Sequence, residues 1–491
     1  MDEAGAIPWG ERLRAQRQTS GLTLRQASEV TGFSLSHLSN VERGARAAAE
    51  PLVRAYAQLG AAAAGHPSTP STNPAALPTA PAPAVGDDFG TRLLRLRLSH
   101  GRSLAELAAA THVSKSHLGN LERGRKHPSA AVAAACDREF GADGALAALA
   151  RAPHSPRTPP DPIPAPEDDP FDRPESGPAY AADRAADPAA VLASGTTALL
   201  ALRHAAQHEQ PRPLARELAR QARTIARAAA RCGAGARSGA ASAQPLWLLA
   251  ARCAEFTGWL AEEAGQTATA HAWTEAAARW AAAAGERDMA GYRWERLSLA
   301  ALYRGDRRTT LALAERGLAE RGTSPRIRGL ALRRLAQGHA LAGDRLACER
   351  ALDQAVRLLA RGPAPFPAGP SWGPNSIDDV SGLIRASCLV DLGAHRHATA
   401  VLGTDPGQWA PPGAPRTRAR FVVRGALAFA GAGELDYACA LVESVLADVH
   451  RIDSETVRVD VRTLTDVLLR HPGHAGARRL LPELILATRT R

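Results

Sequence analysis

One segment occurs twice in this chain, 80 residues apart and without a gap, and this duplication constrains the fold more than any other feature. The first copy, at residues 34–44, reads SLSHLSNVERG, and the second, at residues 114–124, reads SKSHLGNLERG. The register extends upstream through the pairs Gly10/Gly90, Arg12/Arg92, Leu13/Leu93, Arg17/Arg97, Gly21/Gly101, Leu24/Leu104 and Thr31/Thr111. Two copies of one small module predict a protein that binds its partner at two places.

The second copy carries the local signals of two short helices joined by a tight turn. Ser103 followed by Glu106 is a capping box, which starts a helix. His112 lies at the turn, Ser114 caps the next helix, and Gly124 is a helix stop. We therefore expect a helix-turn-helix arrangement in this copy.

The first copy carries the same signals with other residues. Thr23 and Gln26 form its capping box, and Ser34 caps its second helix. The helical period places Leu38 and Val41 on the inward side of that helix. The residues that we expect to face outward are Leu35, Ser36, Ser39 and Asn40 in the first copy and Lys115, Ser116, Gly119 and Asn120 in the second.

At these residues the sequence resembles the lambda-repressor-like, Cro-type (XRE) family of helix-turn-helix DNA-binding domains. The resemblance covers residues 9–60 and 89–150, and it implies that helices 35–43 and 115–123 enter the major groove of double-stranded DNA. The base contacts that it implies are Leu35, Ser36, Asn40, Lys115, Ser116 and Asn120. The phosphate contacts that it implies are Arg43, Arg46, Arg123, Arg125 and Lys126. The other residues that it places at the DNA are Ser34, Ser39, Ser114 and Gly119.

The residue types at the implied base contacts differ between the copies. Asparagine can make a bidentate contact to adenine, and lysine can reach the acceptors of guanine. Leu35, where the second copy has Lys115, can contact only a thymine methyl group. We therefore expect the two modules to prefer different half-sites.

The resemblance also implies two structural ion pairs. In this family an arginine of the first helix commonly pairs with the glutamate that ends the recognition helix. The matching pairs in this sequence are Arg17–Glu42 and Arg97–Glu122. A buried glutamate needs such a partner, and the pairing lets a carboxylate lie near a DNA surface without repelling it.

The two modules are unequal in charge. Residues 9–48 carry about +3 and residues 89–128 about +6, and the basic loop of the second copy is replaced by ARAAA after Gly44. Because affinity falls with each lost phosphate contact, we expect the first module to bind more weakly or to serve as a protein contact. The Pro-rich linker 61–86 spans on the order of 28 Å if flexible, which is comparable to the roughly 34 Å between half-sites.

A second repeat fills the C-terminal part, which we delimit as residues 188–491 after an acidic Pro-rich linker at 151–187. Turn glycines recur at Gly265, Gly305, Gly343, Gly393 and Gly433, and a small residue follows most of them five positions later, at Ala270, Cys348, Ala398 and Ala438 with Thr310 the looser case. The pattern resembles the tetratricopeptide repeat, with longer spacing and an incomplete aromatic signature. We predict an all-α chain: two lambda-repressor-like domains followed by a helical-hairpin (TPR-like) solenoid, with an irregular helical bundle as the alternative for the C-terminal part.

Other signals in the sequence favour ordinary packing. The histidines of 471–474 and 395–397 lack the companions of a metal site, so we expect no metal and no cofactor. The aromatic residues between 247 and 303 read as core, with a groove for a peptide or small ligand as the alternative. Arginines such as Arg333 and Arg334 read as a solvated face, of which a minority could clamp a carboxylate or phosphate. No catalytic constellation is recognisable, so an enzyme is not expected.

These observations favour a bacterial transcriptional regulator in the cytoplasm, associated with the nucleoid when bound to DNA. Its expected partners are double-stranded DNA and a peptide, small molecule or protein at the helical repeats. The start of the sequence lacks an apolar core, so we expect neither a signal peptide nor membrane insertion. Relatives of the family usually dimerise, which brings a homodimer into consideration. The alternative is a helical-repeat interaction scaffold whose two modules only localise it or contact other proteins.

Overall fold

The structure is a computed structural model. It describes residues 9–20, 22–24, 26–27, 35–43, 52–53, 56, 88–151, 163–166, 187–234, 239–360, 372, 380–409 and 413–489. Within these ranges the chain is all-α, without a strand. Its contacts divide the chain into two compact units. The first comprises Met1–Pro159, Glu434–Ala440 and Thr465–Arg489, and the second comprises Pro160–Gly433, Leu441–Leu464 and Thr490–Arg491.

The second copy of the duplicated module is a bundle of five helices in the first unit. They are α5 (Phe89–Ser99), α6 (Leu104–Thr111), α7 (Lys115–Glu122), α8 (Ala130–Phe140) and α9 (Ala145–Arg151). A side-chain N-cap starts each of the first four, at Asp88, Ser103, Ser114 and Ser129, and the predicted Ser103–Glu106 capping box is present. Because each cap satisfies a backbone N–H that the helix leaves open, these residues fix where the short helices begin.

Leucines of the first three helices are the most deeply buried part of the core of this bundle, to which α8 and α9 also contribute. Leu93, Leu107, Leu118 and Leu121 are at most 1% exposed. Helices α5 and α7 approach most closely at Gly90, where a Cβ atom would lie 2.2 Å from the carbonyl oxygen of Leu121. Only glycine fits at this crossing, so its recurrence in the duplicated register reflects backbone packing.

The described part of the first copy contains α1 (Trp9–Thr19) and α3 (Leu35–Glu42). Thr23 and Gln26 form the predicted reciprocal capping contacts, with the backbone N–H of Thr23 donating to Oε1 of Gln26 over 2.9 Å. Its buried hydrophobic residues are Leu13, Ala27, Leu38, Val41, Leu52 and Tyr56. The loop after Gly44, where we expected the copies to diverge, lies outside the described residues.

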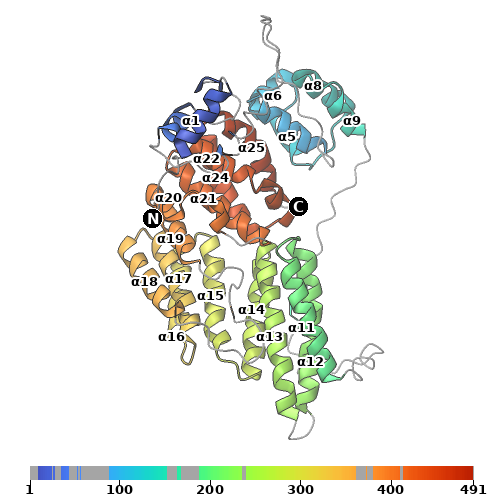
Figure 1. Ribbon diagram of the computed structural model, residues 1–491. Helices are drawn as coiled ribbons and strands as arrows, with labels where there is room; N and C mark the ends of the chain where they lie inside the picture. The colour runs from blue at the N-terminus through green and yellow to red at the C-terminus, as the bar shows by residue number, and fades with distance from the viewer. Residues whose placement is uncertain are drawn as a thin grey trace, which may run out of the picture. The chain divides into compact units, whose positions relative to one another are not determined.

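Helical hairpins make up most of the second unit. Its helices are α11 (Pro188–Ala205), α12 (Pro211–Ala234), α13 (Gly239–Glu263), α14 (Thr267–Ala283), α15 (Asp288–Tyr303), α16 (Arg307–Ala319), α17 (Pro325–Leu341), α18 (Arg345–Leu359), α19 (Ser381–Asp391), α20 (His395–Leu402), η2 (Pro406–Trp409), α21 (Pro415–Gly431) and α23 (Leu446–Ile452). The pairs α13/α14, α15/α16 and α17/α18 follow one another as antiparallel neighbours (Figure 1). Two helices, α22 (Leu435–Glu443) and α24 (Glu455–Leu469), begin in one unit and end in the other.

The predicted turn glycines connect the helices of these hairpins. Gly265, Gly305, Gly343, Gly393 and Gly433 all have a positive φ, between 69° and 87°. A residue with a side chain is strained in this left-handed conformation, so glycine lets one helix end and the next begin. The small residues that follow are buried, with Thr310 and Ala398 at 0% and Cys348 at 1% exposure. They let the second helix of each hairpin pack closely, as the spacing predicted.

Four residues of the predicted acidic linker lie against the second unit. Ile163 is 2% exposed within its hydrophobic core. The indole Nε1 of Trp273 donates to the carbonyl oxygen of Pro164 over 2.9 Å. The backbone N–H of Ile163 donates to Oε1 of Gln266 over 3.1 Å. Residues 163–166 therefore form an ordered strap on α14 within the stretch that we read as a linker.

The last helix, α25 (Ala475–Ala487), belongs to the first unit and packs against α5. Arg95 forms an ion pair with Glu483, with 2.5 Å between Nε and Oε1. Arg489 donates from Nη1 to the carbonyl oxygen of Glu122 over 2.6 Å. The second copy is thus held by residues nearly 400 positions further along the chain. Among the helices that the structure describes, none is long and apolar enough to cross a membrane.

Candidate nucleic-acid interface

The candidate interface is centred on α7 of the second copy. His112 adopts a left-handed conformation with φ of 54° at the end of α6, which turns the chain toward the next helix. Ser114 then caps α7 by accepting the backbone N–H of His117 over 3.2 Å. Gly124 has φ of 64° just after the helix. The sequence signals for a tight turn and for both helix ends are all realised at this helix.

The N-terminal end of α7 presents polar side chains to solvent. Ser114, Lys115 and Ser116 are exposed, and Asn120 is half-buried one turn further along. A lysine ammonium has three donors and an asparagine amide has two donors and an acceptor, which suits base edges in a groove. The exposed end of the helix is therefore able to make the contacts that the resemblance implies.

Gly119 differs from its expected place on the outward side, because the structure buries it. A Cβ atom at this position would lie 3.2 Å from Nη2 of Arg123, whose side chain folds back along the helix. The guanidinium of Arg123 also donates to Oδ1 of Asn120 over 3.3 Å. Gly119 thus makes room for the arginine rather than for a partner, and Arg123 orients the amide of Asn120.

Exposed cations follow the helix. The side chains of Arg123, Arg125 and Lys126 are exposed in the turn and loop after α7. Charges in such a position can neutralise phosphates, which contributes affinity and register but no sequence preference. These three cations lie just after the C-terminal end of α7, and their contact with phosphates remains a prediction.

The structure brings both predicted ion pairs together. In the second copy, Nε and Nη2 of Arg97 donate to the two carboxylate oxygens of Glu122 over 2.6 and 3.0 Å. In the first copy, Arg17 and Glu42 meet in the same bidentate geometry over 2.7 and 2.8 Å. In both pairs the glutamate side chain is 4% exposed. Each pair fastens the end of the recognition helix to the first helix of its module.

A tyrosine that the sequence reasoning missed supports only the first of these pairs. The hydroxyl of Tyr56 donates to Oε1 of Glu42 over 2.9 Å. Burial raises the pKa of Tyr56 above its usual value, and the hydrogen bond to Glu42 raises it further. The equivalent position, 80 residues later, is Cys136, and burial raises the pKa of its thiol to about 11. An alignment of the two copies that continues past the second helix of the motif shows this difference between Tyr56 and Cys136 in the sequence.

The first copy is described only in part at its candidate interface. Ser39 is half-buried and Arg43 is exposed, with Nε of Arg43 donating to the carbonyl oxygen of Ser39 over 3.2 Å. The remaining expected contacts lie outside the residues whose side chains are described. These are Ser34, Leu35, Ser36, Asn40 and Arg46.

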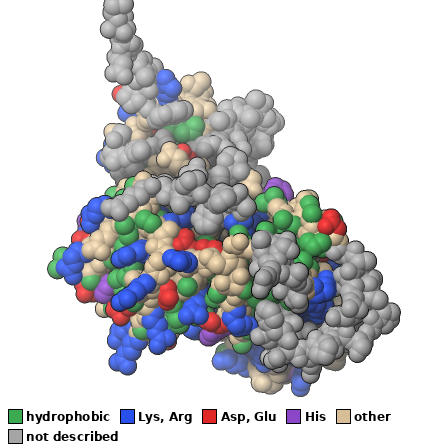
Figure 2. Space-filling model, turned by 90° about the horizontal axis from the view of Figure 1, so that it is seen from below, with side chains coloured by type: hydrophobic (Ala, Val, Ile, Leu, Met, Phe, Trp, Pro, Cys, Tyr) green, Lys and Arg blue, Asp and Glu red, His purple; other side chains and the backbone are tan. Residues whose placement is uncertain are grey.

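On the face of the molecule drawn in Figure 2, arginines do not gather into a site comparable to the cations that follow α7. Figure 2 shows arginine and lysine side chains spread between acidic and hydrophobic ones. Two of the arginines that we expected on a solvated face, Arg333 and Arg334, are only 9% and 6% exposed. They belong to the packed interior of the second unit.

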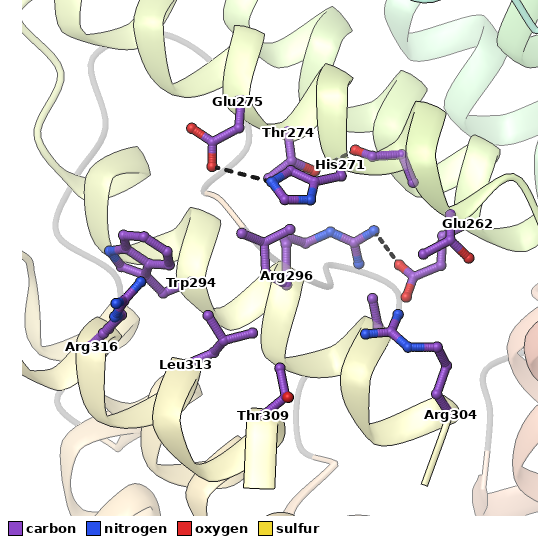
Figure 3. Close-up of a pocket in the computed structure, with 14 residues that line it drawn as sticks. Glu262, His271, Thr274, Glu275, Trp294, Arg296, Arg304, Thr309, Leu313 and Arg316 are labelled. Carbon is purple, nitrogen blue, oxygen red and sulfur yellow. Dashed lines mark hydrogen bonds and ion pairs between the residues drawn. The ribbon is translucent and has the colours of Figure 1, made fainter. Parts of the chain in front are cut away.

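A pocket of about 520 Å³ lies between α14, α15 and α16 of the second unit. In Figure 3, Trp294 lies beside Arg316, away from the ion pair of Arg296 and Glu262. Arg316 lies 5.2 Å from the centre of the Trp294 ring. Nη2 of Arg296 is 2.6 Å from Oε2 of Glu262. Burial raises the pKa of Glu262 even with this partner.

Of the histidines that we considered as metal ligands, His474 has a structural role. Nδ1 of His474 accepts the backbone N–H of Ala477 and so caps α25. Its Nε2 lies 3.0 Å from Oδ1 of Asp436. The described residues contain no group of three or more histidine, cysteine, aspartate or glutamate side chains arranged to hold a metal ion.

Comparison with known protein families identifies the duplicated module. The family model described as "Helix-turn-helix domain" matches residues 9–65 and again residues 88–150. No curated protein and no solved structure matches the chain. The match covers both copies, and it supports DNA binding at a general level.

Proposed function

We propose that this chain is a sequence-specific transcriptional regulator of the Cro-type, XRE class, in which two helix-turn-helix modules bind operator half-sites. The observation that carries the proposal is the second copy. There α7 exposes polar side chains at its N-terminal end, is followed by three exposed cations, and is fastened at its C-terminal end by a buried ion pair. Rigid positioning with exposed donors is what direct reading of base edges requires.

In this proposal the residues of α7 have separate roles. Lys115, Ser116 and Asn120 read base edges. Ser114, at the start of the helix, contacts the sugar–phosphate backbone of the DNA. Arg125 and Lys126 contact phosphates. Arg123 has a double role, because it also holds the amide of Asn120. Gly119 is not a contact residue in this scheme.

The first module is proposed as the weaker reader. Its charge is about +3 over residues 9–48, against about +6 for residues 89–128. Fewer phosphate contacts weaken binding and make it less dependent on salt. Linked to a stronger module, even a weak reader raises overall affinity through effective concentration.

The helical hairpins are proposed to sense a ligand or partner, and a homodimer on DNA in the cytoplasm is part of the same proposal. The support is the repeated hairpin architecture, in which successive helices create concave surfaces for binding. Binding at the hairpins would shift the population of states in which the modules can reach DNA.

The test is an electrophoretic mobility shift of the full chain on a DNA site selected from a random library. Asn120→Ala is expected to cost about 1–3 kcal/mol of specific binding and to relax the base preference at one position. Lys126→Ala is the matched control, since loss of a phosphate contact weakens all sequences alike and lowers the salt slope by about 1. Identical shifts for the wild type and Asn120→Ala would contradict the assignment of the second reader.

The same experiment separates the proposal from the scaffold alternative. A scaffold whose modules serve protein contacts would show no sequence preference in the selection, whereas a regulator enriches a common site. Selection reports half-site sequence, spacing and orientation together, and spacing near one helical turn indicates that both modules bind side by side.

A further inference from the structure

A second cavity of the second unit, of about 450 Å³, is lined by alternate helices along the chain. Residues of α11, α13, α15, α17, α19 and α21 contribute to its wall, together with the start of α24. The volume lies within the range of sites for small molecules. The cavity is distinct from the pocket of Figure 3, although Arg296 borders both.

One wall of this cavity carries a stacked pair of aromatic rings. The rings of Phe256 and Trp259 stack with centres 5.1 Å apart and an angle of 11° between their planes. The guanidinium of Arg203 lies 4.9 Å from the centre of the Phe256 ring, and that of Arg416 lies 5.8 Å from Trp259. A planar apolar group can pack against such a surface, next to positive charge.

The acidic residues of the cavity are already paired. Glu295 lies 2.7 Å from Arg334, and Glu263 lies 2.9 Å from Arg416. Glu263 also accepts the hydroxyls of Ser454 and Thr456. Burial opposes ionisation of Glu263, but Arg416 and these hydroxyls outweigh it and lower its pKa. Each of these carboxylates is therefore engaged with one arginine.

One arginine in the wall has no carboxylate bound directly to it. Arg420 has no hydrogen-bond or ion-pair partner among the described residues, and its guanidinium lies over the Tyr303 ring, 5.1 Å from its centre. Glu263, Asp460 and Glu262 act on its charge without a hydrogen bond to it. Each is paired with another arginine: Glu263 with Arg416 over 2.9 Å, Asp460 with Arg424 over 2.8 Å and Glu262 with Arg296 over 2.6 Å. Burial lowers the pKa of Arg420, yet an arginine stays charged in proteins.

The position of Arg420 fits a ligand that also touches the aromatic wall. It follows Arg416 by one helical turn on α21, and residues so spaced are neighbours on a helix surface, about 5–6 Å apart. Arg416 lies against Trp259. A guanidinium offers a planar fork of donors that matches carboxylate or phosphate oxygens. Arg420 is half-buried, and a cation that is partly removed from water gains from an anionic acceptor.

We infer that this cavity binds a small organic anion, whose flat apolar body packs on Phe256 and Trp259 and whose carboxylate or phosphate group accepts hydrogen bonds from Arg420. The inference rests on the sensing role proposed above for the helical hairpins and names the chemical class of the ligand. The shared chemistry is an aromatic body carrying an anionic group.

The test is isothermal titration calorimetry of the full chain with three probes of similar shape: 2-naphthoate, 1-naphthyl phosphate and the neutral 2-naphthamide. At least one of the two anions is expected to bind at least about tenfold more tightly than the amide, because hydrogen bonds to charged groups contribute on the order of 1.5–3 kcal/mol. The stronger of the two anions identifies the group that the site prefers.

Arg420→Gln is expected to lower the affinity for the anion to that for the amide. Arg420→Lys keeps its charge and should therefore keep part of the preference for the anion over the amide. Arg418→Gln is the matched control, because it lies on the same helix and outside the cavity wall, and it should change nothing. Circular dichroism and thermal melting of each variant show whether it is folded, and Arg420→Lys keeps the test decisive if Arg420→Gln is not.

Equal affinity for anions and amide, no binding of any probe, or equal losses in the Arg420→Gln and Arg418→Gln variants would overturn the inference. These outcomes are distinguishable from a failure of the proposed function, because DNA binding is measured separately and without probe. If mobility shifts depend on Asn120 but no anion binds, the ligand inference is wrong and the DNA reader stands.

Discussion

Replacing Glu122 by leucine tests whether the ion pair behind the recognition helix holds the second module together. The glutamate side chain is 4% exposed and that of Arg97 is 10% exposed, and two hydrogen bonds of 2.6 and 3.0 Å join them. Glu122→Leu leaves the buried arginine without its counter-ion. Breaking a buried pair in this way costs about 3–5 kcal/mol.

That loss is large against the stability of the module. A domain of about 60 residues has a free energy of unfolding of roughly 3–9 kcal/mol in total. We therefore expect α5, α6 and α7 to be largely unfolded in Glu122→Leu while the hairpins of the second unit stay folded. Hydrogen–deuterium exchange of the full chain, followed by mass spectrometry, measures this peptide by peptide. Lost protection should be confined to peptides of the first unit.

The double variant Arg97→Met/Glu122→Leu separates a structural pair from a DNA contact. Replacing both partners of a buried pair by apolar residues of similar volume is often neutral, or stabilising by about 1–4 kcal/mol. The double variant should therefore regain protection and DNA binding. The reasoning is refuted if Glu122→Leu loses less than about 1 kcal/mol, or if the double variant is as unstable as the single one.

Two further substitutions address the packing of the modules. Gly90→Ala places a Cβ atom 2.2 Å from the carbonyl oxygen of Leu121. Overpacking should therefore lower the free energy of unfolding by about 1–3 kcal/mol, measured by chemical denaturation. An unchanged denaturation midpoint would show that α5 and α7 can separate freely. Tyr56→Phe removes the hydroxyl that donates to Glu42 over 2.9 Å. Hydrogen exchange should show the free energy of unfolding lowered by about 1–2 kcal/mol in the first module only. An equal loss of stability in the second module would contradict the assignment of Tyr56 to the Arg17–Glu42 pair.

Much of the local architecture follows from the sequence because it depends on neighbouring residues. The capping boxes at Ser103 and Thr23 act within four residues, and both appear in the structure. The turn glycines of the hairpins act at a single position each, where a positive φ excludes most side chains. Such signals need no knowledge of what packs against them, so they could be read in advance.

Other features depend on residues distant in the sequence, and these could not be predicted. Gly119 was expected outside because its helical position is outside, but Arg123 folds over it. The support of the second module by Glu483 of α25 and by Arg489, which follows that helix, has no sequence signal that points to it. In a chain with so many arginines, pairing partners cannot be assigned from composition.

The arginines of the cavity show why charge counting fails in this chain. Arg334, Arg416 and Arg420 belong to one amino-acid type and one cavity, and no sequence feature separates them. Two have a carboxylate within 3 Å and so contribute little net charge to a ligand site. The third is half-buried over Tyr303, and no carboxylate is bound directly to it. A ligand responds to the uncompensated charge and not to the number of cations, so substituting Arg420 should alter anion binding specifically, whereas substituting either paired arginine should also unfold its surroundings by stranding a buried glutamate.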